Sequence, residues 1–165
     1  MAPSSPYFPP TFADIRRACI QRYKIIIRHL VITSTKYYTW CVRIFKNKEF
    51  NSWANNLGIS DEDIQAAAKE VAAGQHETSL GKKVYKKRIA IGNAGKSSGS
   101  RIIVAFNIGN HMFFIYGFAK GKRANITSKE KKALQKLASV YLNYSDKELN
   151  IAVKQKLLFE VENNG

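Results

Sequence analysis

Four short stretches of the chain have the apolar and polar pattern of strands, and the last three are separated by loops that contain Gly and Asn. Residues 42–45 alternate between apolar and polar positions, as a half-buried strand does. Three more strands are predicted over residues 84–90, 101–107 and 111–118. The short Gly-containing connection at 108–110 predicts a hairpin between the last two.

Between the first two predicted strands, apolar residues recur at helical spacing. Phe50, Trp53 and Leu57 share one helix face, and Gly58 follows as a stop signal. Ser60 then precedes three acidic residues and an alanine-rich run. A Ser cap followed by acidic residues at the positive end of the helix dipole predicts a second helix.

The C-terminal part begins with two capping boxes, T-S-K-E at 127–130 and S-D-K-E at 145–148, which predict two further helices. The order of elements is therefore a strand, two helices, three antiparallel strands and then helices. This order predicts an α+β domain in which the two N-terminal helices pack against one face of a small antiparallel sheet. The opposite face is expected to be open to solvent, as is normal for an antiparallel sheet.

The first 41 residues differ from the rest in composition. Residues 1–13 are rich in Pro and Ser, have no periodicity and are expected to be loosely ordered. Residues 14–29 fit an amphipathic helix, whereas 25–33 fit a strand equally well, and periodicity does not decide between the two. We therefore divide the chain into an N-terminal extension, residues 1–41, and a folded domain, residues 42–165.

The chain has a formal net charge of +15, with 27 Lys and Arg residues against 12 Asp and Glu residues. This excess suits a phosphate backbone, an acidic protein partner or an anionic membrane surface. The best apolar run, 25–33, is interrupted by Arg28 and His29, and a membrane span needs about 20 apolar residues. Cys19 and Cys41 match no metal-ligand spacing. We expect no membrane span, no metal, no cofactor and a reduced, cytoplasmic setting.

Cationic side chains gather on the predicted strands. Lys86 and Arg88 share one strand face because side chains alternate between faces. On the next strand, the apolar residues 102, 104 and 106 are expected to face the helices, so that Arg101 looks outward with Lys86 and Arg88. Any one of these cations is equally an ordinary surface residue. As a set they repel one another unless an anion binds, so they predict a phosphate-binding face.

The segments VYKKRIA, GKSSGSR, IVAF, FFIYGFAK and RANI, in this order, resemble those of RelE/HigB-family toxins of bacterial type II toxin–antitoxin systems. The resemblance covers residues 42–161. It implies a small antiparallel sheet flanked by helices and mRNA cleavage on the ribosome. It also implies a cognate antitoxin of helix-turn-helix type, through which alone operator DNA would be bound.

The resemblance implies metal-independent chemistry, in which the RNA 2′-hydroxyl attacks the adjacent phosphate while cations stabilise the developing charge. By this resemblance Lys86 and Arg88 match the paired strand cations, and Arg101 matches the phosphate-clamping arginine. Lys86 is the better candidate for the base. Lys120 or Arg123 matches the cation after the last strand, and no tyrosine matches the family's C-terminal catalytic tyrosine. The further RNA-binding candidates are Lys87, Lys96 and Lys122.

Two other functions remain open from the sequence. One is a ParE-like toxin that acts on DNA gyrase by binding protein, which would not need Lys86, Arg88 and Arg101. The other is a catalytically inert relative that only binds nucleic acid. Family members typically begin near residue 42, and valine codons include the alternative start GUG. We therefore hypothesise that translation begins at Val42.

Overall fold

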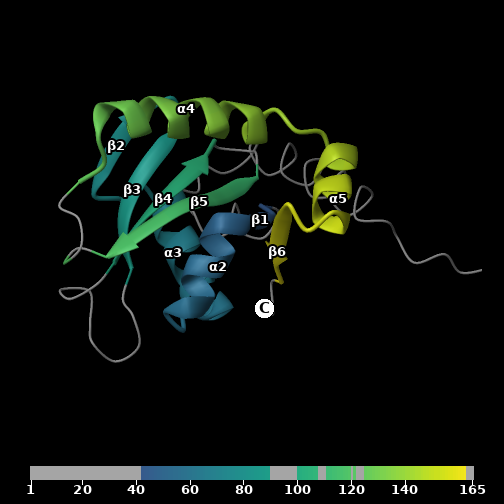
Figure 1. Cartoon of the computed structure of the whole chain (residues 1–165), viewed down its shortest axis with the longest axis horizontal. Coiled ribbons are helices and arrows are strands. Elements are labelled where there is room, and N and C mark those ends of the chain that lie inside the picture. Colours follow the sequence, from purple (N-terminus) through teal and green to yellow (C-terminus); the bar gives the residue numbers. More distant parts are fainter. Residues whose placement is uncertain (1–41, 90–99, 108–110, 120, 122–124, 163–165) are drawn as a thin grey trace, which may run out of the picture. The chain divides into compact units, whose positions relative to one another are not determined.

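The computed structural model describes residues 42–89, 100–107, 111–119, 121 and 125–162. The predicted N-terminal extension lies outside these residues and stays a prediction. Figure 1 shows the described elements, which follow one another in this order: β1 (Ile44–Asn47), α2 (Lys48–Asn56), α3 (Asp61–Ala72), β2 (Thr78–Gly81), β3 (Val84–Ile89), β4 (Ser100–Phe106), β5 (Met112–Ala119), α4 (Ser128–Leu142), α5 (Asp146–Lys154) and β6 (Leu158–Val161).

The strands form one six-stranded sheet in the order β2-β3-β4-β5-β1-β6. The strands from β2 to β5 pair antiparallel with their neighbours, whereas β1 pairs parallel with β5 and antiparallel with β6. The predicted α+β class is confirmed, but the sheet is mixed rather than antiparallel. The parallel pair joins segments far apart in the chain, so no hairpin signal in the sequence indicates its direction.

The helices α2 and α3 cover one face of the sheet. The residues at even positions of β4 point toward them, as expected, and share a core with apolar residues of both helices. The largest buried members of this core are Phe50, Ile64, Ile102, Met112 and Phe114. Trp53 of α2 lies so close to β5 that a Cβ atom at Gly117 would stand 2.3 Å from its ring. Glycine is thus required where α2 meets the sheet.

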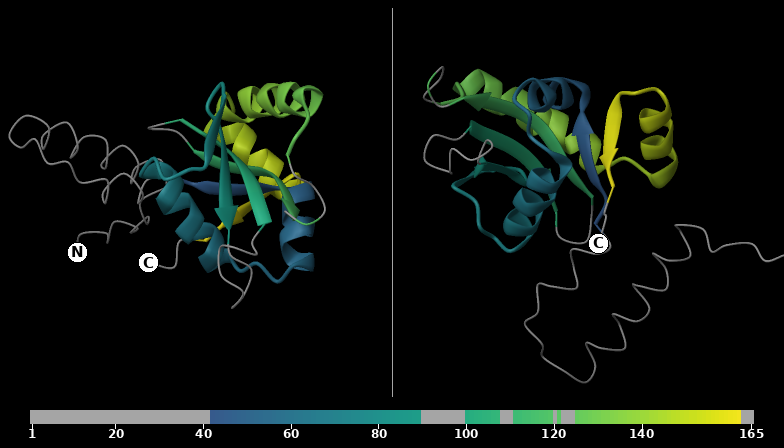
Figure 2. Two further views of the ribbon diagram at one scale, coloured as in Figure 1. Left: turned by 90° about the vertical axis from the view of Figure 1, so that its left-hand side faces the viewer. Right: turned by 90° about the horizontal axis from the view of Figure 1, so that it is seen from below.

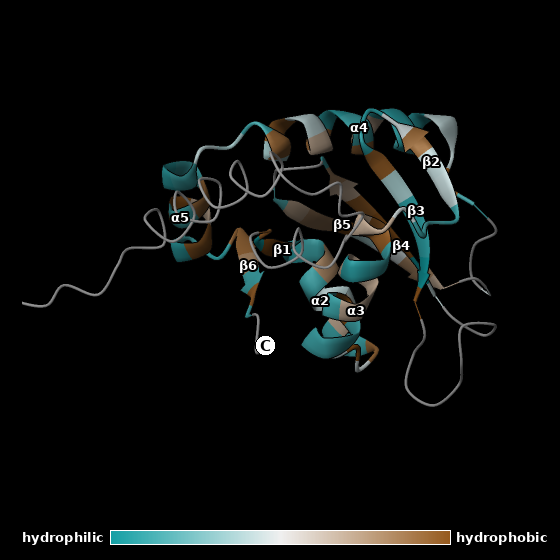
Figure 3. Cartoon of the chain, turned by 180° about the vertical axis from the view of Figure 1, so that it is seen from behind, coloured by the Kyte–Doolittle hydropathy of each residue, from teal (hydrophilic) through white to brown (hydrophobic). Residues whose placement is uncertain are grey.

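The opposite face was expected to be open, and this prediction is wrong. The helices α4 and α5 pack on it, as Figures 1 and 2 show, and they bury a second core against the odd positions of β4. The largest fully buried members of that core are Phe45, Ile103, Phe113, Ile115, Leu149 and Leu158. The central strands are apolar on both faces, which is why Figure 3 shows β4 and β5 largely in brown shades. A sheet with two apolar faces requires two helical layers.

Local signals placed the helices correctly. All three predicted caps are present, at Ser60, Thr127 and Ser145. In each, the cap side chain accepts from the backbone N–H three residues later, and the acidic side chain there accepts from the cap's own backbone N–H. Gly58 follows α2 with a φ of +67°. One cap was not predicted: the Asn47 side chain accepts from the Phe50 N–H at 2.8 Å. Its amide also donates to the Ile115 carbonyl at 2.9 Å, so one buried side chain joins β1, α2 and β5.

No helix of the described residues is long and apolar enough to cross a membrane. Within the same residues, no three His, Cys, Asp or Glu side chains gather where a metal ion could be held.

Candidate functional site

The antiparallel register of β3 and β4 brings three of the predicted cations together. Arg88 is directly opposite Arg101, and Lys86 is directly opposite Ile103. Opposite residues of an antiparallel pair lie on the same face of the sheet. We call Lys86, Arg88 and Arg101 the cation cluster. It lies on the sheet face that α4 covers, because Ile103 belongs to the core on that side.

The three cations differ in exposure. The Arg101 side chain is 9% exposed and that of Arg88 is 54% exposed. Lys86 is buried, and its Nζ lies 3.5 Å from Oδ1 of Asn125, just before α4. Arg101 and Lys86 therefore form the buried end of the cluster, while Arg88 reaches solvent. A ligand can approach from the side of Arg88.

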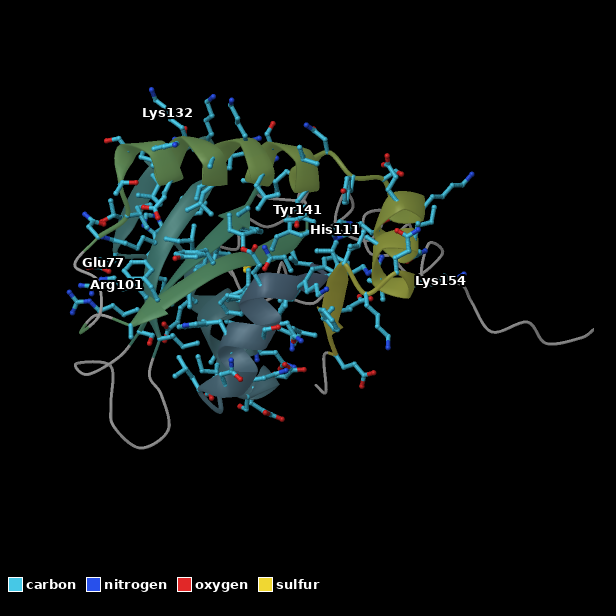
Figure 4. The ribbon with its side chains drawn as sticks, in the orientation of Figure 1. Glu77, Arg101, His111, Lys132, Tyr141 and Lys154 are labelled. Carbon is cyan, nitrogen blue, oxygen red and sulfur yellow. The ribbon has the colours of Figure 1, made fainter. Side chains whose placement is uncertain are left out.

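A carboxylate that the sequence analysis missed belongs to the cluster. Oε2 of Glu77 lies 3.1 Å from Nε of Arg101, and Oε1 lies 3.3 Å from its Nη2. The same Oε1 lies 3.4 Å from Nη2 of Arg88. Figure 4 shows Glu77 and Arg101 side by side. The sequence does not point to this carboxylate, because Glu77 directly precedes β2, a strand that was not predicted.

Charge and burial act on Glu77 in opposite directions. Burial favours its protonated form, but the hydrogen bond from Arg101 and the positive charges of Lys86, Arg101 and Arg88 outweigh this, and the pKa of Glu77 lies below its ordinary value. The carboxylate is therefore ionised at neutral pH. The cation cluster and Glu77 together combine three cationic side chains with one carboxylate.

Lys87, an RNA-binding candidate, does not join the cluster. Because side chains alternate along β3, it points to the opposite face, toward α3. Its ammonium group donates to the Gln75 carbonyl at 2.8 Å and pairs with Glu70 of α3. The structure gives this lysine partners within the protein, on the sheet face opposite the cation cluster.

The remaining predicted cations lie outside the described residues and stay predictions. They are Lys96, Lys120, Lys122 and Arg123. On α4, beside the cluster, four lysines are exposed on the outer surface: Lys129, Lys131, Lys132 and Lys136. Figure 4 shows Lys132 pointing away from the sheet.

Tyr116 of β5 lies on the same face as the cluster. It is opposite Ile103, which in turn is opposite Lys86, so a tyrosine and a lysine flank one buried isoleucine across three strands. Its ring is half-buried and lies 6.1 Å from the ring of Phe118. The sequence alone does not single out this tyrosine, because its alternation with Phe114 and Phe118 is equally that of a core position.

The comparison with protein families gives one match. A family model described as the RelE toxin of the RelE/RelB toxin–antitoxin system matches residues 42–161. No curated protein matches the chain. The matched range contains every described strand and helix, and with them the whole cation cluster.

Proposed function

Because the chain belongs to the RelE family of toxin–antitoxin toxins, we propose that it is an endoribonuclease that cleaves mRNA on the translating ribosome. The observation that carries the proposal is the register that sets Arg88 opposite Arg101, with Lys86 two residues away on the same face. A family whose toxins act on RNA and a cluster suited to phosphate support the same conclusion.

The cluster fits phosphodiester cleavage by the neighbouring hydroxyl group. The RNA 2′-oxygen forms a bond to phosphorus, the bond from phosphorus to the 5′-oxygen breaks, and a cyclic phosphate and a free 5′-hydroxyl result. Guanidinium groups stabilise the charge that grows on the non-bridging oxygens, and this is the role of Arg88 and Arg101. Lys86, at the buried end of the cluster, is the candidate for proton transfer at the reacting oxygens.

The surface beside the cluster supports an RNA substrate. The lysines of α4 project from the helix that covers the cluster's own face of the sheet. Phosphate contacts of this kind position a nucleic acid without reading its sequence. We assign to Lys129, Lys131, Lys132 and Lys136 the role of holding RNA on either side of the cleaved bond.

The family implies an antitoxin partner. A basic surface that is toxic when bare is best covered by a segment of complementary, acidic charge. We propose that the antitoxin is a helix-turn-helix protein that covers the cluster, that operator DNA is bound only through it, and that both proteins act in the cytoplasm.

The test is induced expression of the full chain in a bacterial host, with mRNA 5′ ends mapped on translating ribosomes. Wild type is expected to give in-frame, translation-dependent cuts, and Arg101→Ala is expected to give none. Lys154→Ala is the matched control, because it removes an exposed cation from α5, at the far end of the molecule from Arg101 (Figure 4). Growth arrest without cuts would point to a protein target such as gyrase, and neither arrest nor cuts would point to an inert relative.

A further inference from the structure

Arg88 and Arg101 are held directly opposite each other on neighbouring strands. Like charges in that position destabilise a sheet unless something neutralises them. Glu77 does this, because its Oε1 lies within 3.4 Å of both guanidinium groups. Within the described part of the chain, no other acidic side chain contacts either arginine.

The arginine N–H groups that Glu77 occupies are those that a phosphate would need. A guanidinium group offers parallel N–H donors that fit carboxylate and phosphate oxygens alike. Arg101 donates to Glu77 from both Nε and Nη2. These two groups form the edge of the guanidinium that is best suited to a phosphate. A phosphate cannot occupy the same edge of Arg101 while Glu77 holds it, and two anions repel each other when close together.

Glu77 can leave this position without unfolding the sheet. Its backbone N–H donates to the Lys86 carbonyl at 2.8 Å, so its main chain is fixed to β3. Its side chain is 22% exposed, and it directly precedes β2, which is the edge strand of the sheet. A rotation of the side chain toward solvent is therefore sufficient to free both arginines.

We propose that Glu77 is a positioning residue. In the free protein its carboxylate occupies the position where a phosphate of the substrate binds, and it is displaced when that phosphate enters. The inference rests on the proposed function, since it concerns the same cation cluster. In the free protein Glu77 keeps the buried Arg101 paired and aligned, because an unpaired buried charge is costly. It also makes the cluster selective, since an anion must compete with a tethered carboxylate.

Glu77→Gln tests the exchange, because it keeps the size of the side chain and removes its charge. Binding of inorganic phosphate to the full chain is measured by titration calorimetry. We expect Glu77→Gln to bind phosphate roughly two- to fivefold more tightly than wild type, the scale of one partly exposed ion pair. Glu70→Gln is the matched control, because it removes the same charge from the Lys87 pair on the other face of the sheet. It is expected to leave phosphate binding unchanged.

Three results would overturn the proposal. An equal gain in both variants would mean that only net charge matters. Weaker binding by Glu77→Gln would mean that Glu77 helps to hold the anion. An absence of phosphate binding in wild type and variant would overturn it as well. It would also contradict the part of the proposed function in which the cation cluster binds phosphate. If wild type cuts no mRNA but phosphate binding changes as expected, the result would count against the proposed endonuclease activity and not against the proposed role of Glu77.

A second measurement covers the case in which Glu77→Gln does not fold. In wild type, phosphate titration is expected to shift the ¹⁵N NMR resonance of Arg101 Nε–H, assigned by its loss in Arg101→Lys, together with the ¹³C resonance of the Glu77 carboxylate. Binding of phosphate that leaves both resonances in place would show that no exchange occurs.

Discussion

Lys86 and Lys87 are neighbours on β3, yet they face opposite layers of the molecule. Lys87 faces α3, where Glu70 neutralises it. Lys86 faces the α4 side, among Arg88 and Arg101. The two helices differ in the same sense, because α3 has four acidic residues and one lysine, whereas α4 has four lysines and one glutamate. Among the described residues, the sheet therefore separates a face whose cations are neutralised from a basic face.

This division shows why a count of cations along a strand is a poor guide to function. Lys46, another cation of the sheet, pairs with Asp61 at the start of α3 at 2.6 Å. The acidic first turn of α3 stabilises its own helix and neutralises a lysine of the sheet. Of the cations on the described strands, those left for a ligand lie on the face that α4 covers.

The largest effect that we expect is a separation of activity from stability between the two lysines. Lys86→Ala should lower single-turnover RNA cleavage on ribosomes by about 10²-fold, the usual contribution of a proton-transfer group. Lys87→Ala should leave cleavage per folded molecule unchanged and lower the midpoint of thermal unfolding, because Glu70 would lose its partner. Equal losses of cleavage in the two variants would break the comparison.

The next effect concerns the tight packing on the α2 side. Gly117→Ala should lower the free energy of unfolding by about 1–3 kcal/mol, since the added methyl group would overlap the Trp53 ring. Gly121→Ala is the control, because nothing lies within 4 Å of the added atom. Urea unfolding of both variants measures the difference. A stable Gly117→Ala would mean that α2 can move away from the sheet.

A somewhat smaller effect is expected at the cap of α2. Asn47→Ala should cost about 1–2 kcal/mol, because it removes a buried cap together with the bond to Ile115. Ser145→Ala removes an exposed cap of α5 and should cost about 1 kcal/mol or less. Similar losses in chemical denaturation would indicate that the link from Asn47 to β5 adds nothing.

The smallest effect is the pH dependence contributed by Glu77. Since its pKa is lowered in the folded protein, it stabilises the fold above its ordinary pKa, and this stabilisation is lost as the pH falls through the folded value. The difference in unfolding free energy between wild type and Glu77→Gln should be constant near neutral pH and shrink in acid. A difference that grows in acid would have the wrong sign for a carboxylate paired with arginine.

Features set by neighbouring residues could be predicted from the sequence. Each capping box needs only four consecutive residues, and the boxes at Ser60, Thr127 and Ser145 all start helices. The shared face of Lys86 and Arg88 follows from strand alternation, and their meeting with Arg101 follows from the antiparallel pairing expected of successive strands. These local rules were sufficient for the cluster itself.

Features that depend on distant pairing could not be predicted. β2 has the sequence TSLG, in which only Leu80 is buried, so it has no strand pattern of its own. Without β2, nothing indicates that Glu77 lies beside Arg101. The covered second face was missed for a related reason, since the sequence does not show which core the odd positions of β4 join.

The parallel pairing of β1 with β5 also determines when the sheet can be completed during synthesis. Asn47 and its partner Ile115 are 68 positions apart, and β6 must then add to the other edge of β1. Pairings over such separations close large loops and form late. The first described strand of the chain, β1, therefore cannot complete its pairing until the last one, β6, has been made. A nascent chain that has already made β3 and β4, with their arginines, does not yet have a finished sheet to hold them.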